Sequence, residues 1–203
     1  METSEKASLA DCDLSDEIQE LLLTLLREKT FDGSFIYKYE GVWYRPIFLA
    51  GLISSQKHFH AEDSDTIVIT FPKSGTTWLK ALTYATVHRS LTAMFDSNNS
   101  PLLTTNSHDL APFLDLAYII QTTIFGTLIP YSLLLHSIKN SNCRIVYMCR
   151  NPFDQFISHW KYLQNARDQD LEPNSLEEAF ELVCQGIQPF GPFLGTCVGL
   201  LEG

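Results

Sequence analysis

A group of side chains suited to holding an anion follows one strand-like segment of the chain. Residues 70–80 read TFPKSGTTWLK, directly after the apolar run DTIVI. The segment combines a cation, a glycine and three hydroxyl donors: Lys73, Gly75, Ser74, Thr76 and Thr77. Backbone N–H groups at the start of a helix, with the positive end of the helix dipole, favour phosphate or sulfate. The segment therefore predicts an anion-binding loop between a strand and a helix.

This loop differs from the Walker A motif of Mg-nucleotide enzymes. That motif reads G-x-x-x-x-G-K-[ST], whereas here Lys73 precedes Gly75 and no glycine lies upstream in the loop. The Walker A hydroxyl binds Mg²⁺, so the difference removes the main sequence argument for a metal. The alternative that the pattern leaves open is a tight strand-to-helix connection with an exposed lysine and a Ser/Thr helix cap.

A second strand–turn–helix segment, CRIVYMCRNPFDQFISHW, spans residues 143–160. Arg150 follows its predicted strand, and a guanidinium group binds phosphate with two parallel N–H donors. Ser158 comes two turns into the predicted helix and adds a further donor if it faces the same side. Alone, Arg150 is more typical of a surface residue. Together with the Lys73 loop, it predicts a ligand that carries two separated phosphate-like groups.

Strands and helices alternate around these two segments. Near-continuous apolar runs predict buried strands over 66–71 and 143–149, and a shorter strand is expected over 122–128. The other expected elements are a hairpin or extended stretch over 35–46 and helices over 15–26, 76–89, 109–121, 153–164, after Tyr131 and from Ser175. This alternation predicts an α/β fold in which helices flank a parallel sheet.

The first and last of these helices carry explicit burial predictions. Apolar residues at helical spacing predict one buried stripe on the first: Ile18, Leu21, Leu22, Leu25 and Leu26. The polar stretch 27–30 is expected to end that helix. Ser175 and Glu178 form an S-x-x-E capping box for the last helix, with Leu176, Phe180 and Val183 directed inward.

Length and charge narrow the class of protein. A chain of 203 residues with 45% hydrophobic and 19% charged residues suits one globular domain, or a large piece of one. The net charge of −10 argues against a nucleic-acid or acidic-membrane partner, because such binding needs a basic surface. A bound phosphate must therefore be held by a local set of donors.

The cysteines and the N-terminal residues indicate the cellular compartment of the protein. Five scattered cysteines without a C-x-x-C pair fit a reducing compartment and not a disulfide scaffold or zinc site. The polar, acidic start of the chain has no signal-peptide pattern, and no window is apolar for long enough to span a membrane. A cytoplasmic location is expected, with residues 1–13 as a disordered tail.

Together, the two phosphate-type segments resemble the cytosolic sulfotransferases, and the plant soluble type most closely. TFPKSGTTWLKAL is similar to that family's loop for the 5′-phosphosulfate of 3′-phosphoadenylyl sulfate (PAPS), and RNPFDQFIS is similar to its 3′-phosphate motif. NSHDLAPFLD at 106–115 and IPYSLL at 129–134 also resemble plant members. The resemblance runs from about Ile18 to Phe193.

The resemblance implies a P-loop-like α/β sulfotransferase fold that transfers sulfonate from PAPS to a hydroxyl of a small acceptor, without metal. Six residues would hold the 5′ side of PAPS: Lys73, Ser74, Gly75, Thr76, Thr77 and Trp78. Arg150 and Ser158 would hold its 3′-phosphate, and the Lys73 cation would neutralise the leaving phosphate. His108 and Tyr131 would line the acceptor pocket, together with apolar residues around 112–116.

The chain departs from the family pattern at one catalytic position. The family's base is a histidine in a T-H-L-P segment, and the matching residues here are TLIP, with Leu128 in its place. A positioned general base contributes about 10²–10⁴-fold, so little or no turnover is expected. The alternatives are a non-enzymatic remnant that binds PAPS or its product PAP, and a nucleotide kinase-like enzyme, against which the missing Walker A glycine counts.

The second departure is at the end of the chain. The family's C-terminal R-K-G-x-x-G-x-W-K segment, which covers the 3′-phosphate, is not found, so a fold incomplete at its C-terminus is expected. The expected sulfotransferase-like domain is 14–193, followed by an atypical tail over 194–203. The family has the segment WDHVLGYW near this point. LGTCVGLL within the tail resembles the peptide obtained when codons for that segment are translated one base out of frame. A frameshift or splice product is therefore expected there, with an ordinary surface tail as the alternative.

Overall fold

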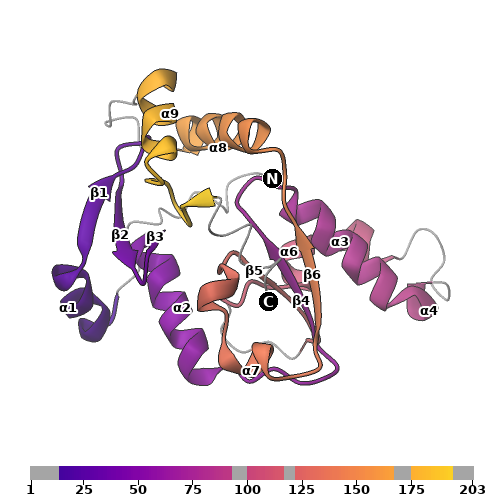
Figure 1. Cartoon of the computed structure of the whole chain (residues 1–203). Helices are drawn as coiled ribbons and strands as arrows, with labels where there is room; N and C mark the ends of the chain where they lie inside the picture. The colour runs from indigo at the N-terminus through magenta and orange to yellow at the C-terminus, as the bar shows by residue number, and fades with distance from the viewer. Residues whose placement is uncertain (1–13, 93–99, 117–121, 167–174, 194–203) are drawn as a thin grey trace.

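The computed structural model describes residues 14–92, 100–116, 122–166 and 175–193. Within them, two three-stranded sheets form. The antiparallel sheet joins β1 (Leu26–Lys29), β2 (Phe35–Tyr39) and β3 (Val42–Tyr44). The parallel sheet has the order β5–β4–β6, from Ile124–Thr127, Thr66–Thr70 and Arg144–Met148 (Figure 1). The predicted α/β class with a parallel sheet is confirmed.

The ten helices of the described chain vary widely in length. They are α1 (Asp16–Thr24), α2 (Pro46–His58), α3 (Thr76–Val87), α4 (Arg89–Thr92), α5 (Pro101–Thr104), α6 (Ser107–Leu110), the 3₁₀ helix η1 (Tyr131–Leu133), α7 (His136–Lys139), α8 (Pro152–Ala166) and α9 (Leu176–Cys184). In Figure 1, α2 and α3 lie on opposite sides of the parallel sheet, and α8 crosses above its upper end.

The central strand β4 is buried along its whole length, as its apolar sequence predicts. Because side chains alternate along a strand, Ile67 and Ile69 join the main core with α2 and η1, whereas Val68 packs with Leu79 of α3. β4 therefore packs against helices on both faces of the parallel sheet. Since β5 and β6 run parallel to it, the carboxyl ends of all three strands reach the same edge of the sheet.

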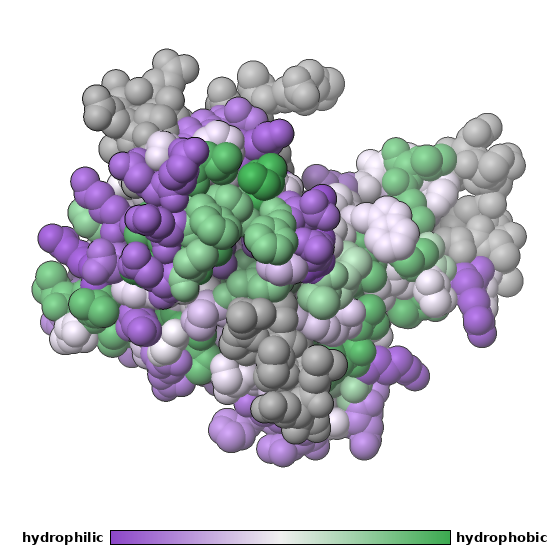
Figure 2. All heavy atoms as spheres, turned by 45° about the horizontal axis from the view of Figure 1, so that its top comes forward, coloured by the Kyte–Doolittle hydropathy of each residue, from purple (hydrophilic) through white to green (hydrophobic). Residues whose placement is uncertain are grey.

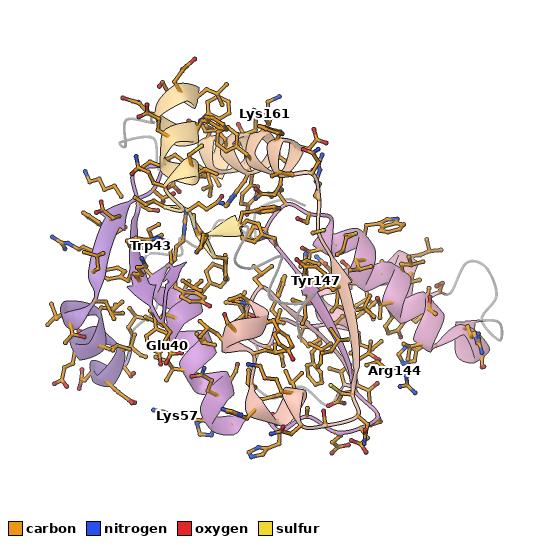
Figure 3. The ribbon with its side chains drawn as sticks, in the orientation of Figure 1. Glu40, Trp43, Lys57, Arg144, Tyr147 and Lys161 are labelled. Carbon is orange, nitrogen blue, oxygen red and sulfur yellow. The ribbon has the colours of Figure 1, made fainter. Side chains whose placement is uncertain are left out.

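The N-terminal hairpin is confirmed, and the predicted helical, buried position of Leu26 beside it is wrong. Glu40 and Gly41 form the β2–β3 turn with positive φ angles of 46° and 86°, and Figure 3 shows Glu40 and Trp43 on the same hairpin. Of the stretch 27–30, expected only to end the first helix, residues 27–29 supply most of β1, because they pair with β2. Leu26 consequently leaves the predicted buried stripe and is 61% exposed.

The helix predicted over 109–121 is also wrong. α6 ends at Leu110, shortly before Pro112, which has no backbone N–H to continue a helix. The chain then turns along β5, where Gly126 N donates to Pro112 O at 2.7 Å and Leu114 N donates to Gly126 O at 2.8 Å. Residues 112–114 therefore run along the free edge of β5. The rest of the predicted helix, 117–121, lies outside the described residues.

Two burial predictions fail in the later half of the chain. β6 was expected to be buried, but Ile145 is 40% exposed and Arg144 is exposed, because in the described chain β6 is an edge strand. The capping box of Ser175 and Glu178 is confirmed. The expected inward direction of the α9 apolar residues is wrong for Leu176 and Phe180.

Those two side chains, with others on α8, border a shallow apolar groove of about 310 Å³ lined by Phe153, Phe156, Ile157, Leu176, Glu177 and Phe180. Figure 2, in which the upper end of Figure 1 is turned forward, shows hydrophobic surface between polar flanks. The expected tails at 1–13 and 194–203 lie outside the described residues. Among the helices described, none is both long and apolar enough to cross a membrane.

Candidate functional site

The loop between β4 and α3 has the backbone geometry of a tight, outward-facing turn. Lys73 has a φ of 62° and Gly75 a φ of 100°, both in the left-handed region. Lys73 pays a conformational cost there of order 1–3 kcal/mol. Gly75 avoids that cost, and a Cβ at this position would lie 2.9 Å from Met148 Cε of β6. Gly75 also caps the N-terminus of α3, so backbone N–H groups of the first turn face the loop.

The hydroxyl groups of the loop differ in their hydrogen bonding. Thr70 and Thr76 bond to each other, with their Oγ1 atoms 2.6 Å apart. Ser74 is only 6% exposed, and its Oγ has no hydrogen-bond partner among the described residues. Leaving a buried hydroxyl without a partner costs about 1–3 kcal/mol. Ser74 therefore has a donor that a bound anion would satisfy.

Arg150 lies against this loop. Its Nη1 donates to Lys73 O at 3.2 Å. The contact follows from the sheet order, because β6, which Arg150 follows, is paired with β4, which the Lys73 loop follows. Open α/β sheets bind ligands at the carboxyl ends of adjacent strands. The structure thus brings the two sequence segments together at one edge.

Ser158 lies on the side of α8 that faces the loop. Gln155, three residues earlier, donates from Nε2 to Pro72 O at 2.9 Å. Tyr162, four residues later, lies with its ring centroid 4.1 Å from Lys73 Nζ. Residues three and four apart share one face of a helix, so Ser158 is on the same side as both contacts.

Gln155 and Tyr162 belong to the candidate site by their contacts with the loop, although the sequence analysis did not name them. Their spacing from Ser158 was a readable signal, since i−3 and i+4 positions share its helix face. The loop and α8 therefore form one surface that combines Lys73, Arg150 and several neutral donors.

The electrostatics of this surface favour an anion. Partial burial lowers the pKa of Lys73 from its ordinary value, and the nearby charge of Arg150 lowers it further. Two like charges held together repel each other, and a bound anion relieves that repulsion. Trp78, in the first turn of α3, is 64% exposed and adds an open aromatic surface beside the donors.

A second polar cluster lies behind the first turn of α3. His108 of α6 bridges two α3 side chains: its Nε2 is 3.3 Å from Thr77 Oγ1, and its Nδ1 is 3.3 Å from Lys80 Nζ. The imidazole stacks on Phe113, with ring centroids 5.3 Å apart. Lys80 Nζ also lies 3.1 Å from the centroid of the Phe113 ring. Lys80 was not singled out from the sequence, where it reads as an ordinary helical lysine.

Lys80 is completely buried, and its position depends on a missing side chain. A Cβ on Gly126 of β5 would overlap Lys80 Cε. Burial lowers the Lys80 pKa to about 7, although the charge of Asp115 acts to raise it. Burial in turn raises the pKa of Asp115 to about 6, against hydrogen bonds from neighbours such as Thr127, whose Oγ1 donates to Asp115 Oδ1 at 3.0 Å.

Two further positions singled out from the sequence are Leu128, at the family's base position, and Tyr131, expected in the acceptor pocket. Leu128 is 9% exposed, packs in the main core, and donates its backbone N–H to the Asp115 carboxylate. Tyr131 begins η1, where its ring centroid lies 5.1 Å from Lys139 Nζ of α7.

Residues 112–116, also expected near the acceptor, lie in two different surroundings. Phe113 contacts His108, whereas Leu114, Asp115 and Leu116 border a cleft of about 430 Å³ between α1 and α2. In Figure 3, Lys57, which lines this cleft, lies toward the lower end of α2. None of the cleft's lining residues belongs to the Lys73 loop.

The metal prediction concerns clusters of ligating side chains. Within the described ranges, no group of three or more His, Cys, Asp and Glu residues could hold a metal ion. The groups at the loop and beside it are a lysine, an arginine, hydroxyls and backbone N–H groups, and the charged and N–H groups among them are hydrogen-bond donors that suit an oxyanion and not a cation.

Comparison with known proteins identifies the family to which this chain is similar. A family model for the sulfotransferase domain matches residues 63–201. Cytosolic sulfotransferase 15 and cytosolic sulfotransferase 13 of Arabidopsis thaliana are 38% and 39% identical over 92% and 95% of this chain. The matches cover 55% and 60% of those two relatives, so the chain spans little more than half of their length.

Solved structures show the same architecture. A crystal structure of an Arabidopsis thaliana sulphotransferase superposes with a TM-score of 0.79 and 38% identity, covering 94% of this chain and 68% of that one. A mouse sulfotransferase in complex with PAP gives a TM-score of 0.61 over 82% of this chain and 57% of its own. At 21% identity, the second comparison speaks for the fold alone.

Proposed function

Because this chain belongs to the sulfotransferase family, we propose that the Lys73 loop and the facing side of α8 bind PAPS. The observation that carries the proposal is the contact of Arg150 with the backbone of Lys73, which joins the two segments that we propose to bind oxyanions. A ligand with a 5′-phosphosulfate and a separate 3′-phosphate matches two such segments. ATP lacks the 3′-phosphate that Arg150 would bind.

The residues of the loop fit the 5′ end of this ligand. The buried Ser74 Oγ, which has no partner within the described chain, would donate to an oxygen of the phosphosulfate. The first-turn N–H groups of α3, beginning after Gly75, would add donors and the helix dipole. Thr76 and Thr77 supply further hydroxyls, and the exposed Trp78 ring is available to the adenine.

The chemistry asked of the chain is charge stabilisation. PAPS, when bound, supplies a sulfonate group on a phosphate that leaves with an added negative charge. We propose that Lys73 neutralises that charge; its ammonium, which lies against the Tyr162 ring of α8, supports this role. Such preorganised cations are worth several kcal/mol in a transition state. Arg150 and Ser158 hold the other phosphate and contribute binding and alignment.

The acceptor is proposed to be a hydroxyl of a small metabolite, bound beside His108 and Phe113. His108 contacts Thr77 of the donor loop, and Phe113 stacks on His108. Tyr131 is proposed as a further pocket residue. A cytoplasmic location is proposed because the two Arabidopsis relatives are cytosolic sulfotransferases.

Turnover by this chain is proposed to be low. Leu128 is an apolar core residue with no side-chain atom that can accept a proton. Its presence also supports the second candidate, a chain that binds PAPS or PAP without transferring sulfonate. Sulfonate transfer from radiolabelled PAPS to a panel of phenols separates the two: slow transfer supports the enzyme, and bound PAPS without any transfer supports the binding protein.

Calorimetry with PAP tests the donor site itself. Wild type and Lys73→Ala are titrated with PAP and with Mg-ATP, and Lys139→Ala on α7 serves as the matched control for loss of an exposed lysine. We expect PAP to bind more tightly than ATP, and Lys73→Ala alone to weaken it by about 10-fold or more, as for a lost charge-assisted hydrogen bond. Tighter binding of ATP, or equal effects of the two alanine variants, would contradict the assignment.

A further inference from the structure

Sulfonation of a hydroxyl releases one proton, and the chain must provide an acceptor for it. The acceptor O–H bond breaks, an O–S bond forms, and the S–O bond to the phosphate breaks with its electrons staying on the phosphate. Leu128 cannot take the proton. Beside Thr77 of the proposed donor loop, a different titratable side chain is in place, namely His108.

We propose that His108 accepts the proton of the acceptor hydroxyl in this chain, and that Lys80 and Asp115 control whether it can do so. The inference rests on the proposed function, since it concerns the same donor site. It is carried by a chain of contacts from Thr77 through His108 to Lys80. Position 128 is linked to Lys80 only indirectly, because the Leu128 N–H bonds to Asp115 and the charge of Asp115 acts to raise the Lys80 pKa.

The two ring nitrogens of His108 have separate tasks in this arrangement. When Lys80 is an ammonium, it donates to Nδ1, so a neutral imidazole carries its proton on Nε2 and cannot accept another there. When Lys80 is an uncharged amine, it accepts from Nδ1–H, which leaves the Nε2 lone pair facing the Thr77 side. Only the second state can accept a proton from a substrate hydroxyl.

The proton then moves in two linked steps. The hydroxyl proton goes to His108 Nε2, and the proton on Nδ1 goes to Lys80 Nζ, so the imidazole ends uncharged. The new positive charge rests on Lys80, above the Phe113 ring and within the field of Asp115. Both surroundings stabilise an ammonium.

The Lys80 surroundings make the uncharged amine accessible near neutral pH. Its side chain is fully buried, and burial brings its pKa to about 7. In the described chain, the ionisable groups that bear on it are His108 from α6 and Asp115 from the following segment; β5 presents Gly126, which has no side chain. Turnover should therefore increase as the pH rises through about 7, because Lys80 loses its proton.

The acidity of the acceptor distinguishes a base from a structural residue. Sulfonation by wild type, His108→Gln and the surface control His136→Gln is measured with 4-methylphenol, which ionises near pH ~10 like tyrosine, and with the far more acidic 4-nitrophenol at a pH where it is already ionised. We expect His108→Gln to lower kcat for 4-methylphenol by about 10²-fold and for 4-nitrophenol by less than about 10-fold. The control should match wild type with both.

Equal losses with the two phenols would overturn the proposal, since a structural effect does not depend on acceptor acidity. So would a wild type that binds PAP and transfers sulfonate to neither phenol; the proposed donor site would then stand without this base. Failure to bind PAP at all would instead contradict the proposed function. A Leu128→His variant adds a second check: with a base restored at 128, His108→Gln should cost less than in wild type.

Nuclear magnetic resonance of the ligand-free chain, labelled with ¹³C-lysine, tests the relay without catalysis. We expect one Cε signal to titrate near pH 7, to be missing in Lys80→Met, and to change its midpoint in His108→Gln. A Lys80 signal that titrates at the ordinary value for a lysine side chain, about 10, would overturn the proposed control by Lys80.

Discussion

Replacing Ser74 by alanine should make the ligand-free protein more stable and PAP binding weaker. The Ser74 side chain is buried, and its Oγ has no hydrogen-bond partner among the described residues. Its hydroxyl therefore destabilises the free protein and stabilises the complex. Opposite signs for stability and affinity are expected only of a group that is held ready for a ligand.

The structure sets the size of both effects. Removing an unsatisfied buried hydroxyl relieves a penalty of about 1–3 kcal/mol, which in a chain of this size raises Tm by roughly 2–4 °C per kcal/mol. Removing a hydrogen bond to a charged ligand costs about 1.5–3 kcal/mol. The Kd for PAP should therefore rise by roughly 10- to 150-fold.

Thermal unfolding without ligand and calorimetry with PAP measure the two quantities. Thr66→Val provides a matched control, because Thr66 Oγ1 is also buried without a partner in the described chain but lies at the far end of β4. This variant should gain stability like Ser74→Ala and bind PAP like wild type. If Ser74→Ala loses stability, or binds PAP as tightly as wild type, Ser74 is not a vacant donor for the ligand.

Three further predictions concern the groups around the loop. Arg150→Ala should weaken PAP by roughly 10- to 100-fold and leave 5′-AMP, which has no 3′-phosphate, almost unaffected in calorimetry; equal losses would place Arg150 elsewhere on the ligand. Gly126→Ala should lower the free energy of unfolding in urea by about 1–3 kcal/mol because its Cβ overlaps Lys80 Cε, and the cost should shrink in a Lys80→Ala background. Because folding lowers the Lys80 pKa to about 7, the unfolded chain binds more protons above that pH, so wild-type stability should increase from pH 7 to 9. Lys80→Met should show a smaller increase, and an unchanged slope would contradict the burial of an uncharged Lys80.

Much of the architecture could be predicted because its signals are local. The apolar run of β4 identifies a central parallel strand, and Ser175 with Glu178 marks a helix start by spacing alone. The strand formed by residues 27–29 could not be predicted from that polar stretch, since its pairing depends on the separate strand β2. The burial of β6 depends on what lies beside it in the sheet, which its own sequence does not encode.

Some features of the candidate site could likewise be predicted from the sequence, and others could not. The nearness of Arg150 to Lys73 could be expected, because each follows a parallel strand of one sheet. Gln155 and Tyr162 could have been found from their spacing to Ser158. Lys80 could not, because its burial depends on Gly126, a residue distant in sequence that leaves room for its side chain. A lysine inside an apolar helix face usually reaches the surface, so only the fold reveals this one.

Thermal unfolding with and without PAP tests directly whether the Lys73 loop and α8 together form the donor site. A ligand at 100 times its Kd adds about 2.7 kcal/mol to the free energy of unfolding. We predict one cooperative transition whose Tm rises with PAP, and rises distinctly less with 5′-AMP at the same concentration. A Tm that PAP leaves unchanged, or that both nucleotides raise equally, would contradict the account.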